Sequence, residues 1–153
     1  MKKMIVTILI LYFNFFFLNG NDVFRLDYDC SLDNAVILAS VIHSVDSQYI
    51  QNLLDENCSI HLIARVDNNG HLIDISVSKR FEENISIYLL QKVKNFIINN
   101  DIRFYVCFLD EPGMKIDYIK REDNNMVSLA IPGGGEFRTR LIHYLKYKRI
   151  IKE

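Results

Sequence analysis

Residues 61–79, HLIARVDNNGHLIDISVSK, alternate apolar and polar side chains on both sides of an Asn-Asn-Gly turn, and this pattern constrains the fold more than any other stretch. A period of two is typical of a strand with one buried face, and Asn-Gly is a favoured hairpin turn. The pattern therefore predicts a β-hairpin with strands at 60–66 and 72–78. Its apolar face requires a cover, which another part of the chain must supply.

The turn also predicts which residues of the two strands face each other. If Asn69-Gly70 is a two-residue turn, residues whose numbers sum to 139 are paired. Arg65 then lies opposite Asp74 on the polar face, where an ion pair contributes little. A four-residue loop starting at Asp67 would keep the faces but separate Arg65 from Asp74. On the apolar face, the two-residue turn pairs Val66 with Ile73, Ala64 with Ile75, and Leu62 with Val77.

Directly after the hairpin, the apolar period changes to that of a helix. Glu82 and Glu83 suit the positive end of a helix dipole, and Asn99-Asn100 offers a stop. We therefore predict an amphipathic helix at about 84–98, whose apolar stripe covers the hairpin. The stripe consists of Ile85, Leu89, Val93 and Phe96 or Ile97.

The flanking segments complete an α+β fold. Residues 35–42, AVILASVI, form an apolar block that suits a buried strand or a helix, and its periodicity does not decide between them. A short helix is predicted at 47–56, with Asp46 or Ser47 as its cap. The predicted fold class is a small antiparallel sheet packed against the helix at about 84–98. Its strands are the hairpin and segments near 102–109, 115–120 and 126–131.

Residues 58–109 resemble the C-terminal domain of TonB and its relatives. The likeness consists of a strand, a turn with Asp67 and Gly70, a second strand, and a helix with Leu89 and Val93, followed by a third strand. Members of that family are small α+β modules of the periplasm that act through protein contacts. The best-known member adds a strand to a receptor segment. The resemblance thus implies a non-enzymatic interaction module whose partner is another envelope or secreted protein.

The N-terminal residues predict export. Lys2 and Lys3 precede an apolar run from Ile5 to Leu18, which is the pattern of a secretory signal peptide. The run is shorter than the roughly 20 residues that a membrane-spanning helix needs, so cleavage is favoured over an uncleaved anchor. The predicted organisation is a signal peptide at 1–20, one domain at 21–132, and a Gly-rich joint with a basic amphipathic tail at 133–153. The predicted location is periplasmic or extracellular.

Charge and cysteine content fit an exported protein. Removal of residues 1–20 leaves 16 basic against 19 acidic side chains, a net charge of −3, which disfavours general binding to nucleic acid. In an oxidising compartment, two of the three cysteines, Cys30, Cys58 and Cys107, can form a disulfide. Buried thiols are the alternative, because a free cysteine packs as a small apolar residue.

The candidate chemistry is sparse. His43, His61, His71 and His143 are dispersed and have no recognised metal-ligand spacing, although His61 and His71 could meet on the polar face of the hairpin. Cys107 lies within an apolar strand pattern, where a buried inert thiol is expected. No catalytic, cofactor-binding or metal-binding residue is therefore predicted.

Two further hypotheses follow from the same residues. A small secreted enzyme or ligand-binding protein could assemble its site from His61, His71 and Cys107. Contact with a membrane surface could occur through the basic tail at 136–153, which reads as strand or helix, with the N-terminal segment retained as an anchor. A docked terminal element with a solvated basic face is the simpler interpretation of the tail.

Overall fold

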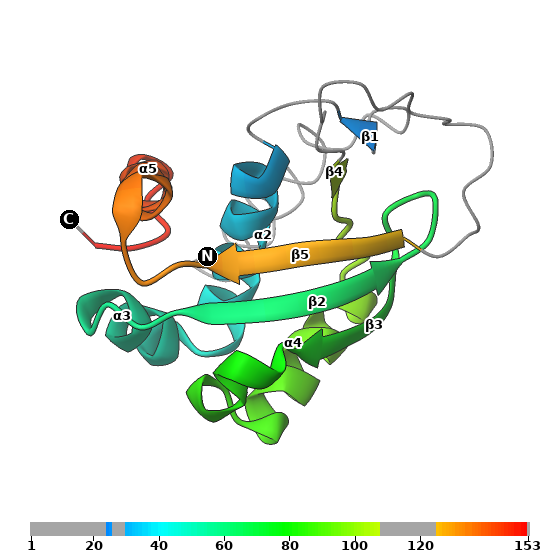
Figure 1. The fold of residues 1–153 in the computed structure, drawn as a ribbon, viewed down its shortest axis with the longest axis horizontal. Helices are drawn as coiled ribbons and strands as arrows, with labels where there is room; N and C mark the ends of the chain where they lie inside the picture. The colour runs from blue at the N-terminus through cyan, green and yellow to red at the C-terminus, as the bar shows by residue number, and fades with distance from the viewer. Residues whose placement is uncertain (1–23, 26–29, 108–124, 153) are drawn as a thin grey trace, which may run out of the picture.

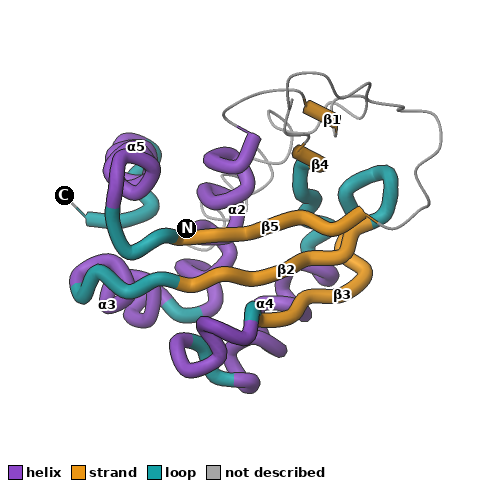
Figure 2. Tube along the Cα trace, viewed as in Figure 1, coloured by secondary structure: helices purple, strands orange, loops and turns teal. Residues whose placement is uncertain are grey.

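The computed structural model describes residues 24–25, 30–107 and 125–152 and has the α+β fold that the sequence predicts. A three-stranded antiparallel sheet has the order β3-β2-β5, and helices pack against it (Figures 1 and 2). The predicted signal peptide at 1–20 and the predicted strand at 115–120 lie outside the described residues. In chain order the elements are β1 (Phe24–Arg25), α2 (Cys30–Val45), α3 (Ser47–Asp55), β2 (Ile60–Val66), β3 (Leu72–Val77), the 3-10 helix η1 (Lys79–Asn84), α4 (Ile87–Asn99), β4 (Val106–Cys107), β5 (Asn125–Ile131) and α5 (Gly135–Tyr147).

The hairpin β2-β3 has the predicted register over most of its length. Leu62 pairs with Val77, Ala64 with Ile75, and Arg65 with Asp74. The predicted pairing of Val66 with Ile73 is wrong, because the register shifts between Arg65 and Val66 and sets Val66 opposite Leu72. A bulge of this kind inserts one unpaired residue, which here is Ile73.

Helix α4 covers the apolar face of the hairpin, as predicted. Leu62 and Ile75 of the sheet belong to one buried cluster with Leu89 and Val93 of α4. The helix begins at Ile87, later than residue 84, because Ser86 caps it by accepting the Leu89 N–H at 3.1 Å. The preceding residues, with Glu82 and Glu83, form η1 instead.

Helix α2 is the element that the sequence left ambiguous, and it is the centre of the fold. The apolar block 35–42 lies within it, and most of its residues are buried. A helix that is apolar over most of its circumference needs protein around it. In Figure 1, α2 lies behind the sheet, and it contacts α3, α4, α5 and β5. No helix among the described residues is long and apolar enough to cross a membrane.

The predicted strand at 102–109 differs most from the structure. Only Val106–Cys107 are in a strand within the described part, and this strand pairs in parallel with β1, outside the three-stranded sheet. The side chain of Asn34, at 0% exposure, explains the break. It accepts the Tyr105 N–H at 2.9 Å and donates to the Tyr105 carbonyl at 2.8 Å, which occupies the backbone groups that a strand neighbour would use.

The tail folds as helix α5 and docks on the body through one face. Leu141 and Leu145 are fully buried in the same core cluster as α2. Close packing also fixes the preceding glycines, because a Cβ at Gly133 would lie 2.6 Å from the Asn57 carbonyl oxygen. Gly135 has φ +86°, a left-handed conformation that favours glycine.

Arg138 is the buried cation that holds α5 in place. Its side chain is 4% exposed and reaches the end of α3. The guanidinium donates to the carbonyl groups of Pro132 at 2.7 Å, Cys58 at 3.3 Å and Leu53 at 3.5 Å, and also to that of Leu54. Burial lowers the pKa of Arg138, partly offset by the nearby Cys58 thiol. The carbonyls at a helix C-terminus carry partial negative charge, which this cation complements.

Candidate interaction site at the β3 edge

Strand β3 forms one edge of the sheet. Within the described ranges it pairs only with β2. The Ser78 N–H donates to the His61 carbonyl at 2.9 Å, which marks this as a hydrogen-bonded pair. Because such pairs alternate along an antiparallel ladder, the backbone N–H and C=O groups of Val77 and Ile75 point away from β2. The edge therefore presents the Val77 N–H and the carbonyl groups of Ile75 and Val77, while the Ile75 N–H also interacts with the Asp74 carboxylate.

An apolar side chain lies at one end of this edge. The bulge leaves Ile73 out of the paired register, and 42% of it is exposed. Two isoleucines on the solvent side of α4, Ile87 and Ile98, are also exposed. The hairpin and α4 therefore present apolar side chains that the core does not use. Exposed apolar groups beside unpaired backbone groups are typical of a surface that receives another chain.

A single ion pair connects the edge strand with α4. Lys94 Nζ lies 2.9 Å from Asp74 Oδ1, so the lysine reaches from the helix on the inner side to a residue of the polar face. The hydrogen bond from Lys94 lowers the pKa of Asp74, and the Ile75 backbone N–H adds to this effect. Asp74 has its predicted cross-strand neighbour Arg65, but its ion pair is with Lys94. Charged residues on an edge discourage unspecific strand pairing.

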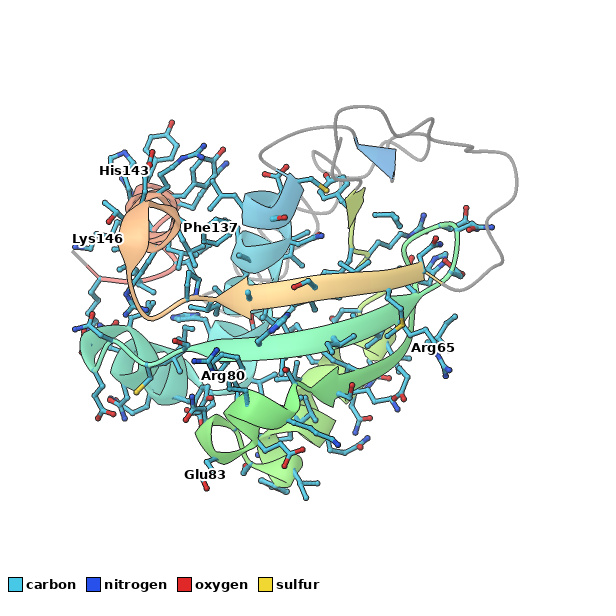
Figure 3. The ribbon with its side chains drawn as sticks, viewed as in Figure 1. Arg65, Arg80, Glu83, Phe137, His143 and Lys146 are labelled. Atoms are coloured by element: carbon cyan, nitrogen blue, oxygen red, sulfur yellow. The ribbon has the colours of Figure 1, made fainter. Side chains whose placement is uncertain are left out.

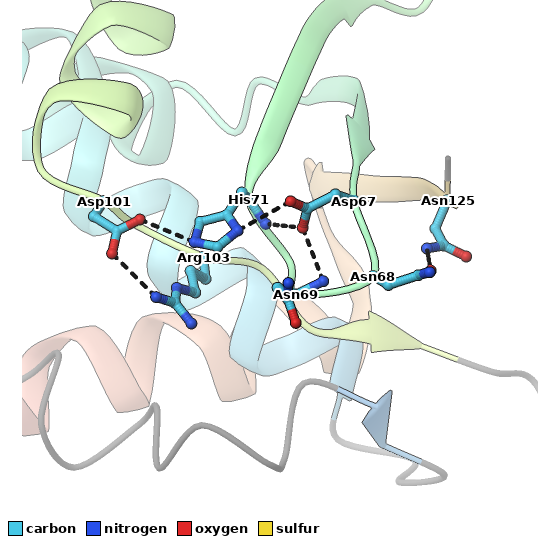
Figure 4. A network of polar contacts seen from close by, with 7 residues as sticks. All are labelled: Asp67, Asn68, Asn69, His71, Asp101, Arg103 and Asn125. Carbon is cyan, nitrogen blue, oxygen red and sulfur yellow. Dashed lines mark hydrogen bonds and ion pairs between the residues drawn. The ribbon is translucent and has the colours of Figure 1, made fainter. Parts of the chain in front are cut away.

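A polar network fixes the hairpin turn next to this edge (Figure 4). The carboxylate of Asp67 accepts the backbone N–H groups of Asn69 at 2.8 Å and His71 at 2.9 Å. Its second oxygen lies 3.0 Å from His71 Nδ1, and His71 Nε2 lies 3.2 Å from Asp101. Arg103 completes the network through an ion pair with Asp101 at 3.2 Å.

The contacts of this network change the pKa of Asp67. Burial raises the pKa of Asp67, but the N–H groups of His71 and Asn69 and the His71 ring outweigh it, so the pKa is lowered overall. His71 lies between two carboxylates, those of Asp67 and Asp101. The arrangement ties the turn to the segment after α4.

The end of α4 places Asp101 in this network. Asp101 has φ +50°, and the Ile102 N–H donates to the Ile97 carbonyl at 3.0 Å, which is the left-handed ending common at helix C-termini. The chain then pairs with the hairpin, since His71 forms an antiparallel bridge with Arg103 and the Phe104 N–H donates to the Gly70 carbonyl at 2.9 Å. Residues 103–104 thus cover the turn, and no other described segment pairs with the β3 edge.

The histidines singled out in the sequence do not meet. His61 Nε2 lies 2.7 Å from Ser128 Oγ, and its ring contacts Phe81 edge-on, near the start of β2. His71 is at the opposite end of the hairpin, about 20 Å away for a strand of this length. His143 is exposed on α5 and His43 lies in the last turn of α2. The described residues contain no group of three potential ligands that could hold a metal.

The cysteines have different states. Cys30 is disulfide-bonded, whereas Cys58 is a partly buried free thiol. Of Cys107 only the backbone is described, as part of β4. A disulfide was one of the two alternatives that the sequence allowed.

Three residues of the site, Lys94, Asp101 and Arg103, carried no recognisable signal in the sequence. Lys94 reads as an ordinary polar position of an amphipathic helix, and Asp101 and Arg103 flank a predicted strand start. Their roles depend on where the helix ends and on which strand lies beside it.

Comparisons of the chain with protein-family models, curated proteins and solved structures found no match.

Proposed function

We propose that this chain is an exported, non-enzymatic interaction module with a TonB C-terminal-like core. It holds an extended segment of another envelope or secreted protein at the outer edge of β3, by adding that segment to the sheet. The one-sided pairing of β3 carries this proposal. Strand addition uses main-chain hydrogen bonds for affinity and side-chain contacts for specificity, and this edge offers both.

The features of the edge support a selective contact. The outward backbone groups of Ile75 and Val77 are spaced as a partner strand requires. Ile73 offers an apolar contact at the turn end. The pair of Asp74 and Lys94 is exposed enough to reorient in water, so it hinders random pairing without closing the edge to a partner that satisfies its charges.

Two features support export. The N-terminal segment has the composition of a signal peptide, and Cys30 is disulfide-bonded. Structural disulfides persist in oxidising compartments and are rare where glutathione keeps thiols reduced. A secreted enzyme or ligand-binding protein is the weaker hypothesis, because His61 and His71, two of the three residues it invoked, lie at opposite ends of the hairpin.

Site-specific photo-crosslinking with a backbone variant tests the proposal. A photoreactive side chain at Ile73 should give a discrete adduct in the native secretory or envelope fraction. Val77→Pro removes an outward N–H without breaking a bond to β2, and proline is tolerated on sheet edges. This variant should lose most of the adduct, whereas Val77→Ala, which keeps the N–H, should retain it.

The control separates lost binding from lost folding. Both variants replace the same half-buried side chain, so similar melting temperatures would show that the difference comes from the backbone donor. An adduct that survives Val77→Pro in a folded protein would contradict strand addition at β3. Equal adduct yield from a photoreactive group at Arg65, on the polar face of the neighbouring strand, would also contradict it.

A further inference from the structure

The outward face of α5 and the residues that follow it form a basic surface with two tyrosines. In Figure 3, His143 and Lys146 point away from the body of the protein, whereas Phe137 lies on the side of α5 toward α2. We call the exposed set the α5 face. It consists of His143, Tyr144, Lys146, Tyr147, Lys148, Arg149 and Lys152.

The α5 face is separate from the packing role of the helix. Arg138, Leu141 and Leu145 are the buried residues of α5, and they attach it to α3 and the core. The α5 face contributes none of these buried contacts. Its side chains are exposed, so one side of the helix docks on the body and the other side is basic.

Charge is concentrated in this part of the chain. Residues 135–152 contain six Lys and Arg side chains and one acidic residue, Glu136, a net charge of +5. The whole chain has a net charge of −1, so the remainder is acidic. Such segregation produces a local positive potential on a protein that is otherwise negative. A partner that complements this positive potential is anionic.

The tyrosines indicate which anionic partner fits. Tyr147 is 76% exposed, and Tyr144 contacts it at a ring centroid distance of 6.5 Å. Lys148 Nζ lies 6.0 Å from the centre of the Tyr144 ring. Tyrosine rings combine an apolar body with a polar tip and prefer the interface between lipid headgroups and water. Lysines beside them can extend their charged ends to phosphate.

We propose that the α5 face binds the anionic surface of a lipid bilayer. Nucleic acid is the weaker complement, because exposed tyrosines beside lysines are typical of the interface between a membrane and water. An acidic protein is also the weaker candidate partner. The α5 face is a convex helix surface with exposed tyrosines, which suits a bilayer because a bilayer is a broad and deformable anionic layer. The proposal does not depend on strand addition at β3, since the two surfaces lie on different elements.

Vesicle co-sedimentation of the mature secreted protein tests this inference. Vesicles of phosphatidylcholine with 30% phosphatidylglycerol should bind the protein, and pure phosphatidylcholine vesicles should not. Each lost Lys or Arg reduces the partition coefficient about fivefold, so the double variant Lys146→Glu with Lys148→Glu should reduce it by at least about 25-fold. Raising the salt from 50 to 500 mM should abolish binding.

A matched variant controls for net charge. Arg80→Glu with Lys92→Glu makes the same change at exposed positions of η1 and α4, and it should leave most of the binding. Equal loss in both double variants would overturn the proposal, as would equal binding to neutral vesicles. Binding to polyglutamate without binding to anionic vesicles would also overturn it and would indicate an acidic protein partner.

Discussion

Replacing Arg138 with methionine should lower the free energy of unfolding by about 3 kcal/mol. The methionine fills much of the space but donates no hydrogen bond. The carbonyl groups of Leu53, Leu54 and Pro132 would lose their common donor, and the partial negative charge at the end of α3 would lose its cation. Chemical denaturation at neutral pH measures the change.

Two further variants identify the cause of this loss. Arg138→Lys keeps the charge, but a single ammonium group cannot reach carbonyls on both sides, so it should fall between wild type and Arg138→Met. Lys146→Met, on the exposed side of the same helix, should change stability by less than about 0.5 kcal/mol. If Arg138→Met were as mild as Lys146→Met, Arg138 would not hold α5 to α3.

Replacing Asn34 with leucine should cost about 2 kcal/mol of the free energy of unfolding. Asn34 pairs with both backbone groups of Tyr105, and both residues are buried. Leucine has the same number and branching of side-chain heavy atoms, so the packing of α2 changes little. The N–H and C=O of Tyr105 would be left without this partner, away from water. Thermal or urea unfolding detects the loss.

The same variant should also release the segment that follows α4. Amide exchange at Tyr105 should become faster, while amides in the middle of β2 should keep their protection relative to global unfolding. Ser44→Ala, at an exposed position of α2 whose hydroxyl bonds within the helix, should be nearly neutral. Unchanged exchange at Tyr105 in Asn34→Leu would show that another contact holds this segment.

Much of the fold was predictable because local patterns and global packing agree. The alternation correctly predicted the buried side chains of β2 and Ile75 of β3, although Ile73 is exposed, and the stripe of Leu89 and Val93 identified the cover. The capped helix at 47–56 is also present as α3, with Asp46 accepting the Tyr49 N–H. Each of these elements shows its period or its cap within a few residues of sequence.

Other parts could not be predicted because they depend on distant contacts. The block at 35–42 is a helix since α3, α4, α5 and the sheet surround it. The strand predicted at 102–109 is interrupted because Asn34, 71 residues away, binds Tyr105. Arg138 reads as one more basic residue of a basic tail, although it is buried against carbonyls of α3.

The candidate site was predictable only in its general form. The sequence predicts a hairpin at the margin of a small sheet, and such a hairpin leaves one edge of the sheet free. Which backbone groups face outward depends on the register, and the exposure of Ile73 depends on the bulge between Arg65 and Val66. The bulge itself follows from the turn chemistry of Asp67 and Gly70, which the register expected for a two-residue turn does not capture.

Amide hydrogen exchange along β3 is the most direct measurement of the central claim, which is that the β3 edge is open to a partner strand. In the free protein, the amides of Ile75 and Val77 should exchange rapidly, while those of Ser76 and Ser78, which face β2, should be protected. Uniform slow exchange at all four amides would contradict the claim, because it would show that the edge is already covered.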